Sequence, residues 1–339
     1  MRLAAAASCA ALLASCAIDS GHPGAGQRSY VNPVLDRDFP DPAVLRSRDG
    51  WFYAYATQAV SQGTMINIQV ARSHDLVAWE YLGDALPRKP AWSASKQKFW
   101  APHVIYDEGQ QQYFMYYSAE PDDATGKCLA VAVSAAPAGP FSDSGAPLVC
   151  GQGIEQIDPM AFDDPRTGRH LLYWGSGSEP IKVRELAPDR LGFLPGSAPQ
   201  AIVFPEDTKY RTLIEGAWVV YRDGNYYLFY SGDRCCAREP RYALMAARAA
   251  DAFGPFESLE RPVLEANGFW LAPGHNSVVT DDAGRDWLLY HATDAARAFY
   301  SGDRSRVMLL DRLVYEEGWP RVEDGQPSAS ARAAPFLSR

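Results

Sequence analysis

A short aromatic run recurs five times along the chain, about sixty residues apart, and it limits the possible folds more than any other feature. Each copy ends at a small or polar residue, namely Ala56, Ser118, Gly175, Ser231 and His291. Runs of this length rich in Tyr, Phe, Trp and Leu are typical of β-strands. The five copies occupy residues 51–55, 113–117, 171–174, 226–230 and 287–290.

A second apolar run precedes each aromatic run, with a turn between the two in most copies. The turns include Asp49-Gly50 and Asp223-Gly224. Two short strands joined by such a turn form a β-hairpin, so the sequence predicts five hairpins. The preceding apolar runs occupy residues 43–45, 103–106, 160–162, 217–220 and 277–279.

A third apolar run follows each hairpin, and an edge segment with an aromatic residue follows in most copies, as at Trp79 and Trp319. A repeat of about sixty residues with four short strands is typical of a propeller blade. We therefore predict an all-β fold, a five-bladed β-propeller over residues 30–322 with four-stranded blades around a central channel. Residues 323–339 are predicted to be a C-terminal tail, either a loop or a fraying end. A β-sandwich is the alternative, which five copies in register disfavour.

The N-terminus has the pattern of an export signal. Arg2 precedes an apolar stretch, residues 3–13, that is too short for a permanent membrane helix. The segment Leu13-Ala14-Ser15-Cys16 resembles a bacterial lipobox, in which the cysteine is lipidated; an ordinary signal peptide is the alternative. We predict a lipoprotein signal peptide at 1–15, a tether at 16–29 with a lipid on Cys16, and a periplasmic or cell-surface location.

Four further cysteines would lie in the exported part of the chain, where disulfides can form. Cys128 and Cys150 flank a predicted strand region and could pair. Cys235 and Cys236 are adjacent and could form a ring or stay free. A zinc site is not predicted, because no C-x-x-C pair with a second cysteine or histidine pair is present.

The charge distribution restricts the partners. The net charge is −9, and no run of Lys or Arg is present. Nucleic acid is therefore excluded as a predicted partner, and a neutral substrate fits the acidic balance. We expect a soluble monomer that meets the membrane only through the lipid.

Three carboxylates precede the predicted innermost strands, at what the repeat predicts to be equivalent positions: Asp41, Asp158 and Glu215. The innermost strands line the channel of a propeller, so these residues should meet at one mouth. Clustered and partly desolvated carboxylates raise at least one pKa, as a general acid requires. A single acid is more simply explained as a turn residue, but three in register favour catalysis.

These motifs resemble those of glycoside hydrolase family 43. The resemblance covers about residues 30–322. It implies an inverting hydrolase of α-L-arabinofuranosyl linkages in arabinan or arabinose-decorated plant polysaccharides or oligosaccharides. A β-xylosidase of the same family and a noncatalytic sugar-binding propeller remain alternatives. Invertase-like enzymes fit less well, because Glu215 is followed by Gly216 rather than Cys. The matching segments are 32–35, 38–42, 100–103, 158–159, 215–216, 274–276, 306–308, Asp311 and 318–320.

The resemblance also implies a role for each acid. Asp41 would be the general base that activates water, and Glu215 the general acid that protonates the leaving oxygen. Asp158 would raise the pKa of Glu215 and orient it. Inversion needs room for a water molecule, so the acid and base carboxyls should lie about 6.5–9.5 Å apart.

Further substrate contacts are expected around the three acids. Trp100 offers a flat face for a sugar ring, and His103 and Arg306 are expected to bind substrate. The adjacent Cys235 and Cys236 are expected near the mouth. In arabinan-cleaving relatives the residue matching His275 lies near a channel ion, which implies calcium or another ion here. Hydrogen bonding of His275 to the acids is the alternative, since calcium prefers oxygen ligands.

Overall fold

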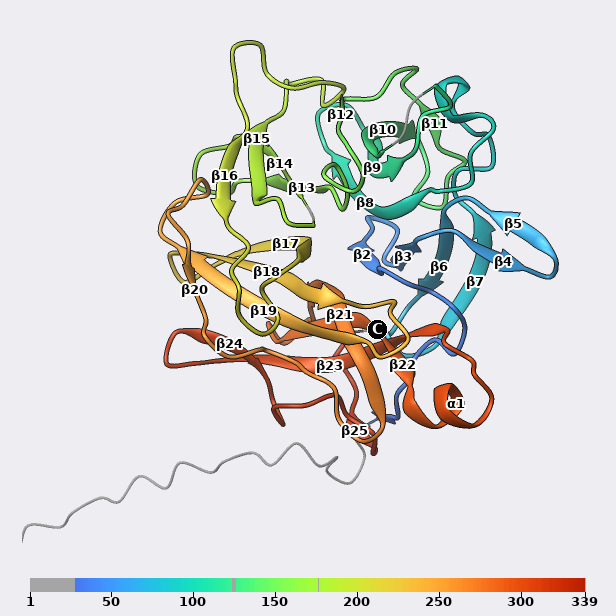
Figure 1. The fold of residues 1–339 in the computed structure, drawn as a ribbon, viewed down its shortest axis with the longest axis vertical. Coiled ribbons are helices and arrows are strands. Elements are labelled where there is room, and N and C mark those ends of the chain that lie inside the picture. The colour runs from blue at the N-terminus through green and yellow to red at the C-terminus, as the bar shows by residue number, and fades with distance from the viewer. Residues whose placement is uncertain (1–27, 124–125, 176, 339) are drawn as a thin grey trace, which may run out of the picture.

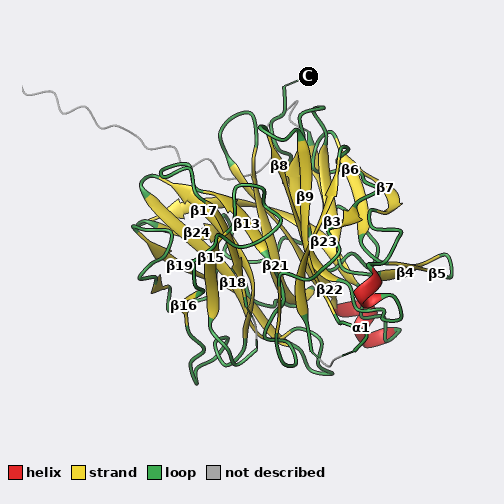
Figure 2. Ribbon diagram, turned by 90° about the horizontal axis from the view of Figure 1, so that it is seen from above, coloured by secondary structure: helices red, strands yellow, loops and turns green. Residues whose placement is uncertain are grey.

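The computed structural model describes residues 28–123, 126–175 and 177–338. Five antiparallel sheets stand around a central axis (Figure 1), and the view from above shows that nearly all regular structure is strand (Figure 2). The predicted five-bladed β-propeller is thus confirmed. Within the described ranges, no helix is long and apolar enough to span a membrane. Cys16 and the predicted signal peptide lie outside these ranges.

The first strand of each blade lies at the channel. Each contacts the first strands of both neighbouring blades, which closes the ring. These strands are β2 (Ala43–Arg46), β8 (Trp100–Asp107), β13 (Met160–Asp163), β17 (Ile214–Arg222) and β21 (Trp270–Thr280).

The other three strands of each blade follow outward in sequence order. The second strands are β3 (Phe52–Ala56), β9 (Gln112–Ala119), β14 (His170–Trp174), β18 (Asn225–Arg234) and β22 (Asp286–Asp294). The third strands are β6 (Gln69–Ser73), β10 (Cys128–Ser134), β15 (Ile181–Glu185), β19 (Arg241–Ala249) and β23 (Arg306–Glu316). The outermost strands are β7 (Trp79–Asp84), β11 (Ser142–Asp143), β16 (Gln200–Val203), β20 (Glu257–Ser258) and β24 (Trp319–Val322).

The remaining elements lie outside this pattern. Strand β12 (Val149–Cys150) pairs with β10, and a disulfide joins Cys128 to Cys150 across that pair. A small hairpin, β4 (Ala59–Ser61) and β5 (Thr64–Ile66), follows β3. Helix α1 (Ala295–Tyr300) follows β22, and the 3₁₀ turn η1 (Ala91–Ser93) precedes β8. The repeat does not predict β4, β5 or α1, because they occur in single blades.

The core lies between neighbouring blades, which explains the continuous aromatic runs. In β3, Phe52 packs toward blade five with Leu289 and Leu310. Its neighbour Tyr53 packs with Met115 of blade two, on the other face. Successive strand residues point to opposite faces, so a strand buried on both faces needs an unbroken apolar sequence. Each large side chain buried in this way contributes about 1.5–3 kcal/mol.

The two ends of the described chain pair with each other beside blade five. Strand β1 (Ser29–Tyr30) pairs with β25 (Arg332–Ala333). Asn32 is buried and donates to the Leu310 carbonyl at 3.0 Å and to Ser328 Oγ at 2.9 Å. Trp270 Nε1 donates to the Ser328 carbonyl at 2.9 Å. The predicted C-terminal tail is a loop with one short strand over residues 323–338 rather than a fraying end, because Asn32 and Trp270 both donate to Ser328.

Candidate active site

In every blade, a residue at the channel mouth, within or just before the innermost strand, has a positive φ angle, and β21 has a second such residue, Ala272. The values lie between 43° and 66°. This left-handed backbone turns the chain into the channel at the same place in every blade. Glycine, aspartate and histidine accept this conformation more readily than most residues, whereas alanine is strained in it. The five residues are Asp41, Ala101, Asp158, Gly216 and His275.

This register corrects the predicted equivalence of the three acids. Asp41 and Asp158 occupy the left-handed position, but Glu215 stands one residue earlier. It pairs with Ser231, as Trp100 pairs with Ser118 in blade two. A shift of one residue changes the direction in which a strand side chain points. Glu215 therefore approaches the pocket from a different angle than the two aspartates, and Gly216 takes the left-handed position.

The backbone N–H of the left-handed residue usually donates to a side chain of the preceding blade. The acceptor lies at the end of the second strand or directly after it. The four bonds are Ala101 to Thr57 Oγ1 at 2.8 Å, Asp158 to Ser118 Oγ at 3.0 Å, His275 to Ser231 Oγ at 2.7 Å and Asp41 to His291 Nδ1 at 3.1 Å. For Gly216, the residue at the acceptor position of the preceding blade is Gly175, which has no side chain to accept the bond. The Gly216 N–H instead donates to Asp158 Oδ2 at 2.9 Å.

Asp41 is buried and firmly oriented. Thr57 Oγ1 accepts the Ala101 N–H, so its own hydrogen is directed to Asp41 Oδ2, 2.5 Å away. Arg306 NH1 donates to Asp41 Oδ1 at 3.0 Å. Burial alone would raise the pKa of Asp41, but the charge of the Arg306 guanidinium acts against burial, and the pKa lies well below its usual value. Asp41 is therefore ionised at neutral pH.

His291 is a neutral acceptor beside Asp41. Burial lowers its pKa to about 4. Its Nδ1 accepts the Asp41 N–H, so the ring proton lies on Nε2. Nδ1 also lies 3.3 Å from Asp41 Oδ1, but its lone pair is already used, so this approach is no salt bridge. Arg306 thus provides the formal positive charge next to Asp41.

Asp158 has the opposite electrostatic environment. Burial raises its pKa well above the usual value, and repulsion from Glu215 and Asp41 adds to the effect. The half-buried Glu215 accepts a hydrogen bond from Tyr242 at 2.8 Å through Oε1. The site therefore combines an ionised carboxylate, Asp41, with a second carboxyl group, Asp158, whose raised pKa favours its protonated form.

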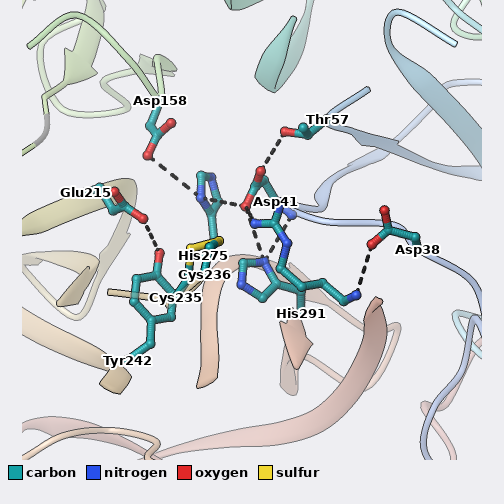
Figure 3. The surroundings of a disulfide bond; sticks show 11 residues. Asp38, Asp41, Thr57, Asp158, Glu215, Cys235, Cys236, Tyr242, His275 and His291 are labelled. Carbon is teal, nitrogen blue, oxygen red and sulfur yellow. Dashed lines mark hydrogen bonds and ion pairs between the residues drawn. A yellow bond between two sulfur atoms is a disulfide. The ribbon is translucent and has the colours of Figure 1, made fainter. Parts of the chain in front are cut away.

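These groups line one pocket of about 390 Å³ at the mouth of the channel. This volume lies in the lower part of the range of small-molecule sites, about 300–1,000 Å³. Figure 3 shows His275 between Asp158 and Asp41, with Glu215 on the side of Tyr242. The lining residues are Asp41, Thr57, Gln58, Trp100, Ile154, Ile157, Asp158, Glu215, Cys235, Cys236, His275 and Arg306.

Of the predicted substrate contacts, Trp100, Arg306 and the cysteine pair line this pocket. Cys235 and Cys236 form a disulfide, which presents a small, rigid apolar surface. The Lys127 ammonium lies 3.4 Å from the centre of the Trp100 ring, so a cation contacts the indole. Burial lowers the pKa of Lys127 to about 7. The residues brought together here come from all five blades and their loops.

His103 does not line the pocket among the described residues, although the sequence predicts it as a substrate contact. It lies deeper in the channel, where its Nδ1 accepts the Ala161 N–H at 3.3 Å. Its ring packs edge-to-face on Trp218 at 5.1 Å, and burial lowers its pKa to about 3. The prediction is corrected because His103 lies two residues beyond the left-handed Ala101, inside the strand rather than at the mouth.

A calcium ion beside His275 would need oxygen ligands from its surroundings. Calcium takes about six to eight oxygen ligands. His275 Nδ1 instead faces Asp41 Oδ1 at 3.3 Å and Asp158 Oδ2 at 3.8 Å. Deeper in the channel the space narrows to about 10 Å³, room for about one water molecule. No group of three His, Cys, Asp or Glu ligands occurs in the described part of the chain. Protein ligands alone therefore do not complete a calcium site here, so an ion at His275 would take most of its ligands from water.

Three residues near the acids were not predicted as site residues. Thr57 and His291 orient Asp41, and Tyr242 contacts Glu215. His291 was visible as the residue that ends the fifth aromatic run, at the position of Ser118 and Ser231. The channel-side end of a second strand was therefore an available signal for His291. Tyr242 opens a third strand, and the repeat gives no signal for it.

Gly216 offers a test of the left-handed position. A Cβ there would lie 3.2 Å from the His275 ring, whereas a Cβ at Gly224, also at positive φ, would meet nothing. Gly216→Ala and Gly224→Ala should each lose about 1–2 kcal/mol of stability, measured by urea unfolding. Only Gly216→Ala should also lower kcat, on the order of tenfold to a hundredfold, by displacing His275. Equal kcat values for the two variants would contradict this.

The chain belongs to glycoside hydrolase family 43, since the model of glycosyl hydrolases family 43 matches residues 30–320. It is 31% identical over 306 residues to the β-D-galactofuranosidase xynD of Aspergillus niger, covering 84% of this chain and 82% of that protein. It is 25% identical to the extracellular exo-α-(1→5)-L-arabinofuranosidase ArbA of Cellvibrio japonicus, covering 85% and 87%.

Solved structures agree with this assignment. The crystal structure of a thermostable family-43 glycoside hydrolase superimposes with a TM-score of 0.76 at 28% identity, covering 91% of this chain and 100% of that one. The Cellvibrio cellulosa α-L-arabinanase in complex with arabinohexaose has the same fold, with a TM-score of 0.70 at 23% identity, covering 85% and 96%. The protein is therefore a glycoside hydrolase of this family.

Proposed function

We propose that this hydrolase cleaves α-L-arabinofuranosyl linkages with inversion, in arabinan or in arabinose-decorated plant polysaccharides and their oligosaccharides. One observation carries the mechanism: the pKa of Asp41 is lowered while that of Asp158, beside Glu215, is raised within one pocket. Environments that push the pKa values of neighbouring carboxyls apart assign a base and an acid.

Each acid then has a distinct step. The ionised Asp41 takes a proton from a water molecule as the oxygen of that water attacks the anomeric carbon. Glu215 gives its proton to the glycosidic oxygen as the carbon–oxygen bond breaks. Asp158, which is held by the Gly216 N–H, raises the pKa of Glu215 and orients it, so that the acid stays protonated until the sugar binds. Arg306 keeps Asp41 ionised, and His275 separates the base from the carboxyl pair (Figure 3).

The preference for furanosyl substrates rests on the relatives. Two of the curated relatives described above act, by name, on L-arabinofuranosyl and D-galactofuranosyl groups. The ring of β-D-galactofuranose has the same configuration as that of α-L-arabinofuranose and differs by one added hydroxymethyl group outside the ring. A site shaped for one ring therefore accepts the other if it has room for that group. Trp100 and the Cys235–Cys236 disulfide supply apolar surfaces suited to a ring face.

β-D-Galactofuranosyl hydrolysis is the second candidate, favoured by the 31% identity to the Aspergillus enzyme. The two candidates differ only in the space that the pocket must provide beyond the exocyclic carbon of the sugar, which is larger for galactofuranose. They share the roles of Asp41, Asp158 and Glu215. A β-xylosidase would have to bind a six-membered ring, and no relative described here favours it.

Export is part of the proposal. Curated relatives include an extracellular arabinofuranosidase and the extracellular endo-α-(1→5)-L-arabinanase 1 of Bacillus subtilis. The disulfides Cys128–Cys150 and Cys235–Cys236 fit an oxidising compartment outside the cytosol. Lipidation of Cys16, outside the described residues, would keep the enzyme at the cell envelope near polymeric substrate.

The substrate proposal is tested by a panel of glycosides. Linear 1,5-α-L-arabinan and the nitrophenyl glycosides of α-L-arabinofuranose, β-D-galactofuranose and β-D-xylopyranose are incubated with the enzyme. Arabinofuranoside cleavage is expected to have the highest kcat/KM, and proton NMR should show β-L-arabinose as the first product. Arabino-oligosaccharides released from arabinan would indicate endo action, and arabinose alone exo action.

Other outcomes separate the alternatives. A higher kcat/KM on the galactofuranoside would move the substrate to the second candidate without changing the mechanism. Exclusive release of xylose would support the xylosidase alternative. Arabinan binding by calorimetry without any hydrolysis would contradict the enzymatic proposal and support a sugar-binding propeller.

A further inference from the structure

A buried tyrosine contacts the acid from the side of blade four. Tyr242 lies at the start of β19 and is 1% exposed. Its hydroxyl donates to Glu215 Oε1 at 2.8 Å (Figure 3). Burial raises the pKa of this phenol well above its usual value, and repulsion by Glu215 adds to the effect. The hydroxyl therefore keeps its hydrogen and remains a donor throughout the working pH range.

The ring of Tyr242 has little freedom to move. It stacks parallel to His291, with 5.9 Å between centroids and 6° between planes. On β21, a Cβ at Gly274 would lie only 2.3 Å from Tyr242 Cε1, so the absence of a side chain there makes room for the ring. The phenol is thus fixed between two neighbouring elements of blade five, and the point at which it contacts Glu215 is fixed with it.

A carboxylic acid has one hydrogen for two oxygens. The oxygen that accepts a hydrogen bond from a neighbouring hydroxyl is the carbonyl-like one, so the acidic hydrogen lies on the other oxygen. For Glu215 the acceptor is Oε1. The transferable hydrogen then lies on Oε2, and rotation of the carboxyl that would exchange the two oxygens breaks the bond to Tyr242.

We propose that Tyr242 is a positioning residue for proton transfer: it fixes the Glu215 carboxyl so that Oε2 presents the hydrogen to the leaving oxygen. This inference rests on the proposed function, in which Glu215 is the general acid. Tyr242 needs no contact with the substrate, because it acts through Glu215.

Tyr242→Phe removes the hydroxyl and keeps the ring. With arabino-oligosaccharides, whose leaving groups need protonation, kcat should fall about tenfold while KM changes little. With aryl arabinofuranosides of strongly acidic phenols, kcat should stay within about twofold of wild type, because these leave without an acid. The alkaline limb of kcat/KM should move to higher pH, since the lost hydrogen bond stabilised the ionised carboxylate.

Tyr290→Phe is the matched control. Tyr290 is also fully buried, and its hydroxyl donates to a carboxylate, Asp311 Oδ2, at 2.6 Å outside the pocket. Both variants should lose a similar amount of stability in urea unfolding, but only Tyr242→Phe should change the leaving-group dependence and the alkaline limb. Replacing Tyr242 with 3-fluorotyrosine strengthens the donor and should move that limb to lower pH, which provides a test if the phenylalanine variant folds poorly.

The outcomes separate this inference from the proposed function. The positioning role is overturned if Tyr242→Phe loses kcat equally on both leaving-group classes, or if its alkaline limb does not move. The proposed function still holds in that case, provided that Glu215→Gln is impaired on oligosaccharides. If Glu215→Gln itself retains full activity on oligosaccharides, the assignment of the acid fails, and the inference fails with it.

Discussion

Asp41→Asn should lower kcat on arabino-oligosaccharides by about 10³- to 10⁴-fold, near the upper end of the range for loss of a general base. Asparagine keeps the shape, and its single side-chain oxygen can accept one of the two hydrogen bonds that Thr57 and Arg306 donate, but it cannot take a proton from water. The loss should appear equally with aryl arabinofuranosides of acidic phenols, because attack by water is impaired whatever group leaves.

Azide gives this prediction a chemical readout. It is a nucleophile that needs no base, so it should restore turnover of Asp41→Asn on aryl arabinofuranosides and yield the arabinosyl azide of inverted configuration. Asp163→Asn is the control, since that carboxylate lines the other end of the channel. Its activity should stay within about twofold of wild type. Failure of azide to restore any turnover, in a variant that is folded by circular dichroism, would contradict the role of Asp41.

The pH profile of the wild-type enzyme follows from the same environment. A general base works in its ionised form, and the charge of Arg306 opposes the effect of burial, so the pKa of Asp41 lies well below its usual value. A lowered pKa moves the acid limb of kcat/KM to lower pH. Activity should therefore persist below pH 4 for as long as the fold does.

Glu215→Gln should lower kcat on arabino-oligosaccharides by about 10²- to 10⁴-fold, because glutamine cannot protonate the leaving oxygen. With aryl arabinofuranosides the loss should shrink as the phenol becomes more acidic, and a plot of log kcat against phenol acidity should steepen. This dependence distinguishes the acid from the base, whose variant should show a loss that is independent of the leaving group.

The control for this variant is Glu265→Gln. Glu265 also accepts a hydrogen bond from a tyrosine, Tyr210, at 3.0 Å, but it lies outside the pocket. Its kinetics should match those of wild type on every substrate. If Glu215→Gln showed the same relative kcat on oligosaccharides and on activated aryl glycosides, Glu215 could not be the proton donor.

The fold was predictable from the sequence because the same pattern of apolar strands and turns recurs in all five blades. The second strand of each blade is buried on both faces, so runs such as 113–117 stay apolar without alternation. The positions of Asp41 and Asp158 followed from their place before the innermost strands β2 and β13. Single features were not predictable: β4, β5 and α1 occur once each, and the packing of Ser328 against Asn32 depends on partners almost 300 residues apart.

The site was only partly predictable, because its chemistry depends on register and on side chains from neighbouring blades. Glu215 takes the position that Trp100 has in blade two, one residue before the left-handed residue, which in blade four is Gly216. No local pattern in the sequence shows which residue takes the left-handed position. His103 was misplaced for the same reason, since the motif that contains it spans both the mouth and the strand behind it. Tyr242 reaches Glu215 from the third strand, beyond any spacing rule.

The ring of left-handed residues has a consequence for how such sites can diversify. One backbone position per blade faces the channel with the same geometry. In this molecule it holds aspartate in blades one and three, alanine in blade two, glycine in blade four and histidine in blade five. Mutation at these five points can change the charge on the axis while the strands behind them stay in place. The conformation also filters the substitutions, since β-branched residues are strongly disfavoured at positive φ. Evolution at the mouth is thus confined to a small set of side chains, and new specificities should arise mainly in the loops around them.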